Sequence, residues 1–120
     1  MKIVYHKEVV QDGYLLTLEI TANVRIPIVK SESLLLKCNS AMLQNMGQNA
    51  AILNDGWTLA PAGGVTSFGS QTDINLLNLD FKVRFDESIR NENSPYSGNR
   101  LEVIELFVRI CDCKPCKSYM

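Results

Sequence analysis

Apolar and polar residues alternate with a period of two in two long segments of the chain. Over residues 14–28 the even positions are apolar: Tyr14, Leu16, Leu18, Ile20, Ala22, Val24, Ile26 and Ile28. From Leu77 to Phe85 the odd positions are apolar, and polar or charged residues separate them. Successive side chains of a β-strand point to opposite faces, so each segment has one apolar and one polar face when extended. The pattern predicts a β-rich protein.

The N-terminal quarter of the sequence has the features of a β-hairpin. Ile3–Val10 predicts a first strand, and Asp12-Gly13 separates it from a second strand over Tyr14–Arg25. Both central residues of a tight type I′ turn need positive φ, which Asp-Gly supplies. Pro27 cannot donate a hydrogen bond to a sheet, so we expect the second strand to leave the sheet or to end at an edge there.

Residues 31–60 fit two interpretations. Four residues recur at helical spacing: Leu35, Cys38, Met42 and Met46. Gly47 would end such a helix, and Asn54-Asp55-Gly56 would then turn a small hairpin over residues 50–60. The alternative is one helix over Asn39–Leu53. We favour the helix followed by the hairpin.

The remaining sequence predicts two long connections and two more strands. Glycine and small polar residues are frequent in Pro61–Asp73, and asparagine and serine are frequent in Asp86–Arg100. We interpret both stretches as extended loops. A third long strand is expected over Ile74–Phe85. The last strand, Leu101–Cys111, has apolar residues on both faces, which favours a central position or an outer face covered by the helix or a partner.

These elements predict one mainly β domain over residues 1–120. Alternating faces need a second layer, so we expect an antiparallel β-sandwich or small flattened barrel of five to seven strands with one short helix. The domain would carry extended loops at 61–73 and 86–100 and a cysteine-containing C-terminal tail at 111–120.

Composition and charge exclude several classes of protein. Hydrophobic residues make up 46% of the chain and charged residues 21%, which argues against disorder. The formal net charge of −1 gives no attraction to nucleic acid or to an anionic membrane, so we predict neither as a partner. No apolar run approaches the roughly 20 residues of a membrane span. The first residues lack the apolar core of a signal peptide, so we expect synthesis in the cytoplasm without export.

The cysteines are the one group of residues whose spacing suggests metal binding or redox chemistry. Cys113 and Cys116 have the C-x-x-C spacing found in zinc knuckles and redox pairs, and Cys111 lies two residues before them. A tetrahedral zinc ion takes four ligands, and the remaining candidates for the fourth are Cys38 and His6, of which Cys38 would connect the tail to the predicted helix. A second C-x-x-C pair is missing. Three alternatives therefore stay open: free reduced thiols, a structural zinc site of Cys38, Cys111, Cys113 and Cys116, or a disulfide.

No catalytic motif is present in the sequence. His6 is the only histidine, which excludes sites with several imidazoles. The glycine-rich stretch from Gly63 to Ser70 lacks the Lys-Ser/Thr ending of a phosphate-binding loop. The acidic residues are dispersed, and none forms a pair suited to glycoside chemistry. We predict that the protein is not an enzyme and needs no cofactor, unless zinc occupies the cysteine cluster.

Two regions offer candidate contact residues for a partner. Trp57 follows the predicted tight turn, and an exposed tryptophan can stack on a sugar ring, although a single tryptophan is more often a core anchor. Pro95 and Tyr96 form a protruding tip in the loop that ends at Arg100. We therefore take Trp57, Pro95, Tyr96 and Arg100 as candidate interaction residues.

In its short length, β content, asparagine-rich loops and lack of a signal peptide, the chain resembles the small virion proteins of tailed bacteriophages. These are head decoration, neck-ring or tail-tube components. The resemblance is one of kind and covers the general architecture along most of the chain. It implies a non-enzymatic structural subunit, located in the virion, whose partners are copies of itself and other subunits. It also implies a long hairpin arm made by residues 80–84, the loop through Tyr96 and Gly98, and residues 101–107.

Two other functions fit the same residues. Trp57 and the Tyr96 loop could serve a small carbohydrate- or ligand-binding β module. The cysteines could instead stabilise a small accessory domain around zinc. Long connections and ordinary charge favour the structural subunit over both alternatives.

Overall fold

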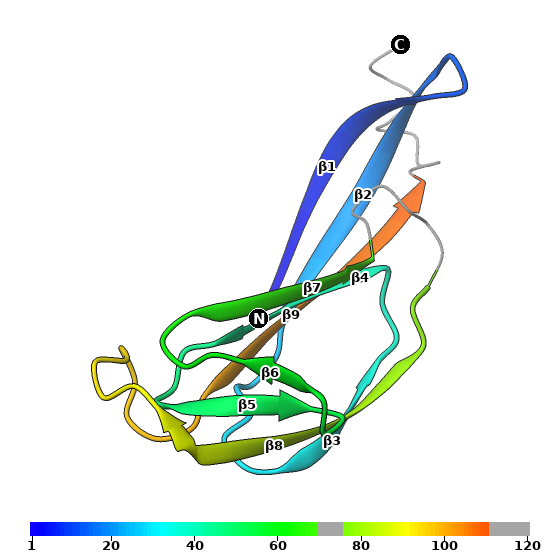
Figure 1. Cartoon of the computed structure of the whole chain (residues 1–120). Helices are drawn as coiled ribbons and strands as arrows, with labels where there is room; N and C mark the ends of the chain where they lie inside the picture. Colours follow the sequence, from blue (N-terminus) through cyan, green and yellow to red (C-terminus); the bar gives the residue numbers. More distant parts are fainter. Residues whose placement is uncertain (70–75, 111–120) are drawn as a thin grey trace.

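The computed structural model describes residues 1–69 and 76–110, and these form an all-β fold of two antiparallel sheets (Figure 1). The strands are β1 (Lys2–Gln11), β2 (Tyr14–Val24), β3 (Glu32–Leu36), β4 (Ser40–Asn45), β5 (Asn49–Leu53), β6 (Trp57–Leu59), β7 (Gly64–Gly69), β8 (Leu79–Arg90) and β9 (Leu101–Ile110). One sheet has the order β1-β2-β9-β4-β7 and the other β3-β8-β5-β6. Neither sheet closes, so the predicted mainly β, sandwich-like class is confirmed and the flattened barrel is not. The predicted five to seven strands are too few, because the described residues form nine.

Both predicted tight turns are confirmed. Asp12 and Gly13 have φ values of 52° and 80°, and Asn54 and Asp55 have values of 51° and 57°. Positive φ at both central residues is the mark of a type I′ turn, which matches the right-handed twist of the strands on either side. These turns fix the registers of the β1–β2 and β5–β6 hairpins.

The predicted helix is wrong in both of its versions, because no helix occurs among the described residues. Leu34 and Leu36 are buried whereas Leu35, between them, is 47% exposed. This burial has the period of a strand. The helical spacing of Leu35 and Met42 was accidental, since both side chains are exposed in β3 and β4. Each of these strands gains a partner in a sheet, and pairing outweighs local preference.

The two long connections are shorter than predicted. β7 occupies much of the stretch expected as a loop over residues 61–73, and β8 continues to Arg90, which leaves 91–100 as the second loop. β8 begins at Leu79, so the predicted third strand is wrong over residues 76–78, which lie in no strand. Ile74 and Asn75 lie outside the described residues. β8 and β9 belong to different sheets, so the hairpin arm expected from residues 80–84 and 101–107 is wrong.

The main core lies between the two sheets. Leu34, Leu36 and Val83 contribute from the four-stranded sheet, and Leu43, Leu101 and Val103 from the five-stranded sheet. A smaller cluster of Leu18, Ile20 and Val108 lies on the opposite face of the five-stranded sheet, which we call the outer face. β9 is the central strand of its sheet, as its two apolar faces predicted.

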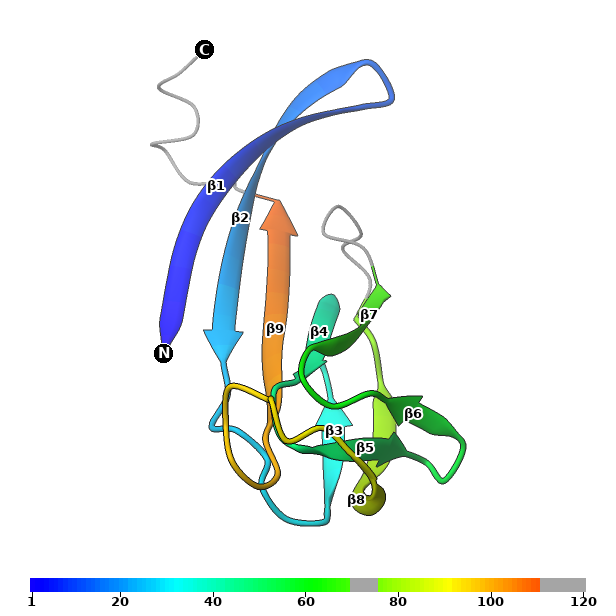
Figure 2. The ribbon, with the colours of Figure 1, turned by 60° about the vertical axis from the view of Figure 1, so that its left-hand side comes forward.

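The β1–β2 hairpin extends beyond the two-sheet body as an arm (Figures 1 and 2). β9 ends at Ile110, which lies opposite Leu18 of β2. Residues 14–17 of β2 and residues 8–11 of β1 therefore pair only with each other among the described strands. The molecule is elongated, with extents of 56 × 25 × 21 Å. The described residues contain no helix suited to crossing a membrane.

Candidate assembly interface

β1 is an edge strand, and no other described strand pairs with its outer side (Figure 2). Val24 N donates to Met1 O at 2.8 Å, and the Met1 amino group donates to Val24 O at 3.2 Å. In an antiparallel ladder such mutually bonded pairs alternate with pairs that share no hydrogen bonds. The odd residues of β1 therefore bond to β2. The even residues turn their N–H and C=O groups away from it: Lys2, Val4, His6, Glu8 and Val10.

The side chains of β1 are exposed along nearly its whole length. Among those described, only Val9 is partly buried, while Val4 is 57% exposed. Ile3 and Tyr5 lie on the outer face with the buried side chains of β2, because they pair with Ala22 and Ile20. The strand thus presents apolar side chains on both faces next to backbone groups that pair with no described strand, and exposed strand edges of this kind can pair with another chain.

The tip of the arm carries an exposed apolar group. Val10 and Leu15 are cross-strand partners, with exposed fractions of 74% and 65%. Tyr14 adjoins them on the other face of the hairpin and is exposed as well. Contiguous exposed apolar side chains are a feature of interaction sites, so the tip is a candidate contact surface.

An ion pair fixes the base of the arm to β9. The Arg109 guanidinium donates to both carboxylate oxygens of Glu19, over 2.8 Å and 2.9 Å. These hydrogen bonds lower the pKa of Glu19. His6 Nε2 lies 3.8 Å from Glu19 Oε2, so β1, β2 and β9 all contribute to this polar cluster. The cluster lies opposite the outer face, because Glu19 alternates with Leu18 and Ile20.

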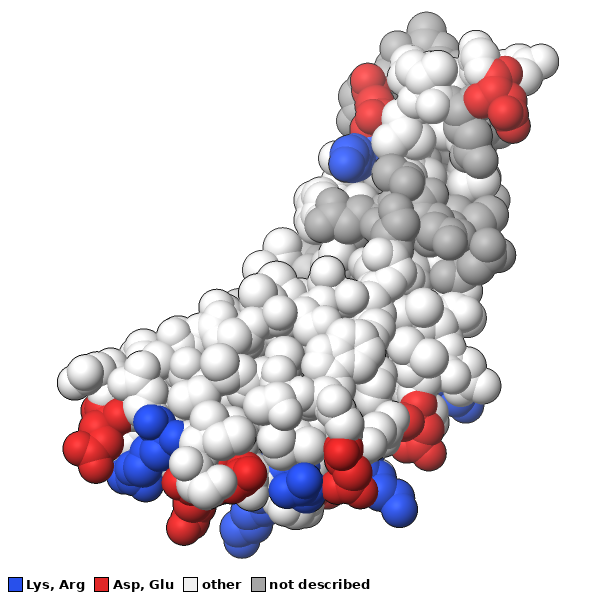
Figure 3. All heavy atoms as spheres, in the orientation of Figure 1, with Lys and Arg blue, Asp and Glu red and all other residues white. Residues whose placement is uncertain are grey.

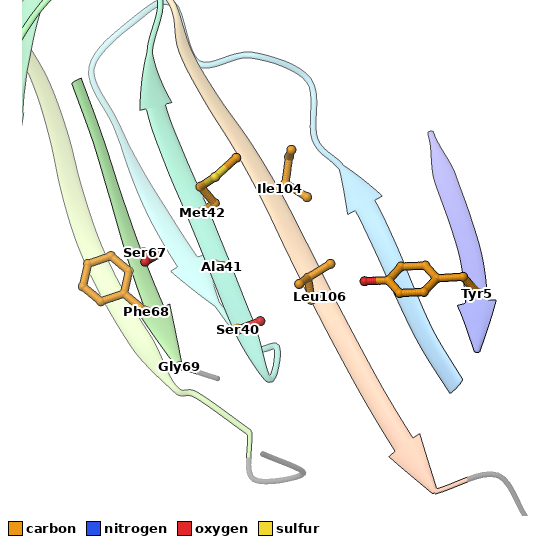
Figure 4. A pocket seen from close by; sticks show the side chains of 9 residues that line it. All are labelled: Tyr5, Ser40, Ala41, Met42, Ser67, Phe68, Gly69, Ile104 and Leu106. Carbon is orange, nitrogen blue, oxygen red and sulfur yellow. The ribbon is translucent and has the colours of Figure 1, made fainter. Parts of the chain in front are cut away.

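A groove of about 410 Å³ crosses the outer face of the five-stranded sheet (Figure 4). Tyr5, Met42, Ile104 and Leu106 line it together with Ser40, Ala41, Ser67, Phe68 and Gly69. Ser40 Oγ is buried and makes no hydrogen bond to the described residues. None of the described lining residues carries a carboxylate, an amine, a guanidinium or an imidazole. The described lining can therefore accept an apolar group.

Charge is distributed unevenly over the molecule. Between residues 38 and 69 Asp55 is the one charged residue, so β4, β5, β6 and β7 are all uncharged. Figure 3 shows acidic and basic side chains along the lower edge and near the arm tip, with a wide band across β7 and β6 that has neither. β1, by contrast, carries Lys2, Lys7 and Glu8.

Two of the predicted interaction residues, Tyr96 and Arg100, lie in contact with each other. Arg100 Cζ lies 4.0 Å from the centre of the Tyr96 ring, and Arg100 Nε donates to Glu102 Oε2 at 3.0 Å. The loop that holds them is tied to the β4–β5 turn by Met46 N to Arg100 O (2.8 Å) and Gln48 N to Gly98 O (2.7 Å). Pro95, next to Tyr96, is exposed.

Trp57 lies apart from this loop. It pairs with Leu53 at one end of β5, whereas the loop over 91–100 attaches at the Asn49 end (Figure 1). The Trp57 ring packs edge-on against Phe68 with 5.1 Å between ring centres, and the side chain is still 46% exposed. Trp57 is thus partly a packing residue, and it forms no common site with Tyr96.

The cysteine hypothesis can be followed only at Cys38. Its side chain is buried, and desolvation together with the negative charge of Glu105 raises its pKa to about 11. Cys111, Cys113 and Cys116 lie outside the described residues. Within residues 1–69 and 76–110, no three His, Cys, Asp or Glu side chains are placed to hold a metal ion. The four-cysteine zinc site stays a prediction.

Sequence reasoning missed the residues that make the arm a candidate interface. Val10, Tyr14 and Leu15 were interpreted only as parts of two strands. The available signal was the run of apolar residues on both sides of the Asp12-Gly13 turn, which a hairpin tip surrounded by solvent does not need. The tip is apolar on both of its faces, so at least one face must be exposed in a two-stranded arm.

The described residues thus form an all-β, two-sheet fold with a projecting hairpin arm. No family model, curated protein or solved structure matches the chain.

Proposed function

We propose that this chain is a non-enzymatic structural subunit of a larger protein assembly. The observation that carries the proposal is the β1–β2 arm, whose apolar tip extends past the end of β9. An isolated two-stranded hairpin is only marginally stable in water. An exposed apolar tip adds nothing to the stability of its own domain, so its value lies in contact with another surface.

The energetics favour contact through the arm. Burial of a large apolar side chain contributes about 1.5–3 kcal/mol, and Val10, Tyr14 and Leu15 are all available for it. The Glu19–Arg109 pair already holds the base of the arm against β9. The arm would therefore lose less conformational entropy on association than a free hairpin would.

The narrower proposal is a virion component of a tailed bacteriophage, such as a head decoration, neck or tail protein. Its support is the resemblance of kind in length, β content and loop composition. The sandwich with an arm is compatible with repeated contacts around a symmetry axis. The partners would be copies of this chain and other subunits of the particle.

A second candidate function is a small carbohydrate- or ligand-binding module. It is favoured by Trp57, which leaves 46% of its surface exposed in an uncharged region. A binding module would remain monomeric, and its Trp57 fluorescence would change when a sugar is added. An assembly subunit would give neither result.

The test is the native mass of the full chain, measured by sedimentation over a range of protein concentrations. We expect the wild type to associate and the double variant Val10→Ser/Leu15→Ser to shift toward monomer. Leu35→Ser is the matched control, because Leu35 is also an exposed leucine but lies in β3, away from the arm. A wild type that stays monomeric, or a tip variant that associates like the control, would overturn the proposal.

A further inference from the structure

We propose that β1 pairs antiparallel with β1 of a second copy of this chain, about a two-fold axis beside Tyr5. This inference rests on the proposed function and names the partner of one surface. The two five-stranded sheets would join into one continuous sheet across the dimer. The proposed partner of the β1 edge is thus the β1 strand of the second copy.

Of the four edge strands, β1 offers the longest regular edge. It has 10 residues, against 6 in β7, 5 in β3 and 3 in β6. Its even residues direct their backbone groups outward, as the Met1–Val24 pair establishes. Antiparallel contact between two copies would pair these outward residues with one another. The β1–β2 ladder would stay intact, because it uses the odd residues.

The charge pattern of β1 selects one register of such a pair. With the axis at Tyr5, Lys2 lies opposite Glu8 of the second copy, and the same contact recurs on the other side of the axis. With the axis at His6 or Lys7, that residue faces its own copy, and Lys7 against Lys7 is repulsive. Opposite charges across strands stabilise a sheet, so the register centred on Tyr5 is favoured.

The other residues of β1 are compatible with this register. Tyr5 faces Tyr5 of the second copy on the outer face, where two aromatic rings can pack together. Val4 lies opposite His6, and Ile3 lies opposite Lys7, whose aliphatic stem can cover it. Every side chain between Lys2 and Glu8 thus has a chemically acceptable neighbour.

The same pairing accounts for two exposed apolar groups at opposite ends of β1. In this register Val9 lies opposite Met1 of the second copy. Val10 therefore lies one residue beyond that Met1, about 3.4 Å further along the strand. Met1 pairs with Val24, and the segment that follows contains Ile26, which is 89% exposed. Antiparallel contact therefore carries the arm tip of each copy toward the exposed Ile26 of the other.

The decisive experiment reverses charges in the full chain and measures dimer dissociation by sedimentation. Lys2→Glu and Glu8→Lys each place like charges opposite one another at two contacts, so we expect each to weaken the dimer about tenfold or more. The double variant Lys2→Glu/Glu8→Lys restores both contacts and should regain most of the affinity. Neither residue forms an ion pair with the described residues, so the fold should tolerate all three variants.

A proline variant tests the backbone contact independently. Val4→Pro removes an N–H that points away from β2, so the monomer fold should be kept and the dimer lost. Circular dichroism and thermal unfolding of dilute protein would verify the fold. The control is Leu35→Ser, whose dimer should match the wild type.

The outcomes separate this inference from the proposed function. If the chain associates but neither single reversal weakens it, or the double variant gives no recovery, β1 pairing is overturned and the assembly proposal stands. If the wild type is monomeric, both fail. Weakening by each single reversal with recovery in the double variant supports the pairing and its register.

Discussion

The body and the arm are built from the same kind of alternating strand, yet their surroundings differ. In the body, two sheets pack face to face, and Leu43 and Leu53 lose all contact with solvent. In the arm, two strands pair without a second layer of described strands, and Val10 and Leu15 remain largely exposed. Alternation therefore reveals that a segment is a strand, while the neighbouring layer decides whether its apolar side chains stabilise the domain or serve a partner.

The largest difference between the body and the arm should be in the free energy of unfolding when one leucine of each is truncated to alanine. Leu43→Ala leaves a cavity between the sheets and should lower the free energy of unfolding by about 2–5 kcal/mol. Leu15→Ala should change it by less than about 0.5 kcal/mol, because the side chain is exposed. Urea unfolding of dilute protein measures both values. An equal decrease in the free energy of unfolding in the two variants would mean that Leu15 is packed as tightly as a core residue, which would contradict the difference between arm and body.

A pair of glycine variants should sharpen the comparison at a smaller scale. A Cβ at Gly47 would meet Arg100 N at 2.5 Å and Gly98 O at 2.6 Å, so Gly47→Ala must displace the loop and should cost about 1–3 kcal/mol. A Cβ at Gly13 would meet nothing, and the cost is the strain of a positive φ, about 1 kcal/mol. Hydrogen exchange should show the Gly13→Ala effect only in the arm. A change that spreads to β4 or β9 would contradict this local origin.

The smallest effect concerns pH at the junction of arm and body. The folded-state pKa of Glu19 is lowered by hydrogen bonds from Arg109, so its contribution to stability is complete above its ordinary value of 4.5. It is lost as the pH falls from 4.5 through the lowered folded-state value. The wild type should thus lose more stability than Glu19→Gln between neutral pH and about pH 3, as urea unfolding would show. Identical dependence of the unfolding free energy on pH in the two proteins would exclude a contribution of the Glu19–Arg109 pair to stability.

The hairpins and the long strands could be predicted because their signals are local. Asp12-Gly13 and Asn54-Asp55-Gly56 specify turns through the backbone conformations that those residues tolerate. The alternation from Leu79 to Phe85 is likewise contained in a single strand. The sheet in which each strand lies depends on contacts between distant segments, such as β2 with β9, which a single sequence does not reveal.

β3, β4 and β7 show why the remaining elements could not be predicted. β7 has two large apolar residues, Val65 and Phe68, and an odd separation places them on opposite faces. It is a strand because β4 offers an edge to pair with. Leu35 and Met42 gave a false helical spacing, since their exposure is visible only in the folded chain. The arm tip did have a sequence signal in the apolar residues on both sides of Asp12-Gly13, but the exposure of its side chains is likewise visible only in the folded chain.

The central place of β9 determines when the five-stranded sheet can form during synthesis. β9 lies between β2 and β4, but it leaves the ribosome long after both of them. At about 5–20 residues per second, the nascent chain waits for several seconds with two strand edges unpaired. The arm can close on its own turn at once, whereas its attachment to the body is among the last steps of folding.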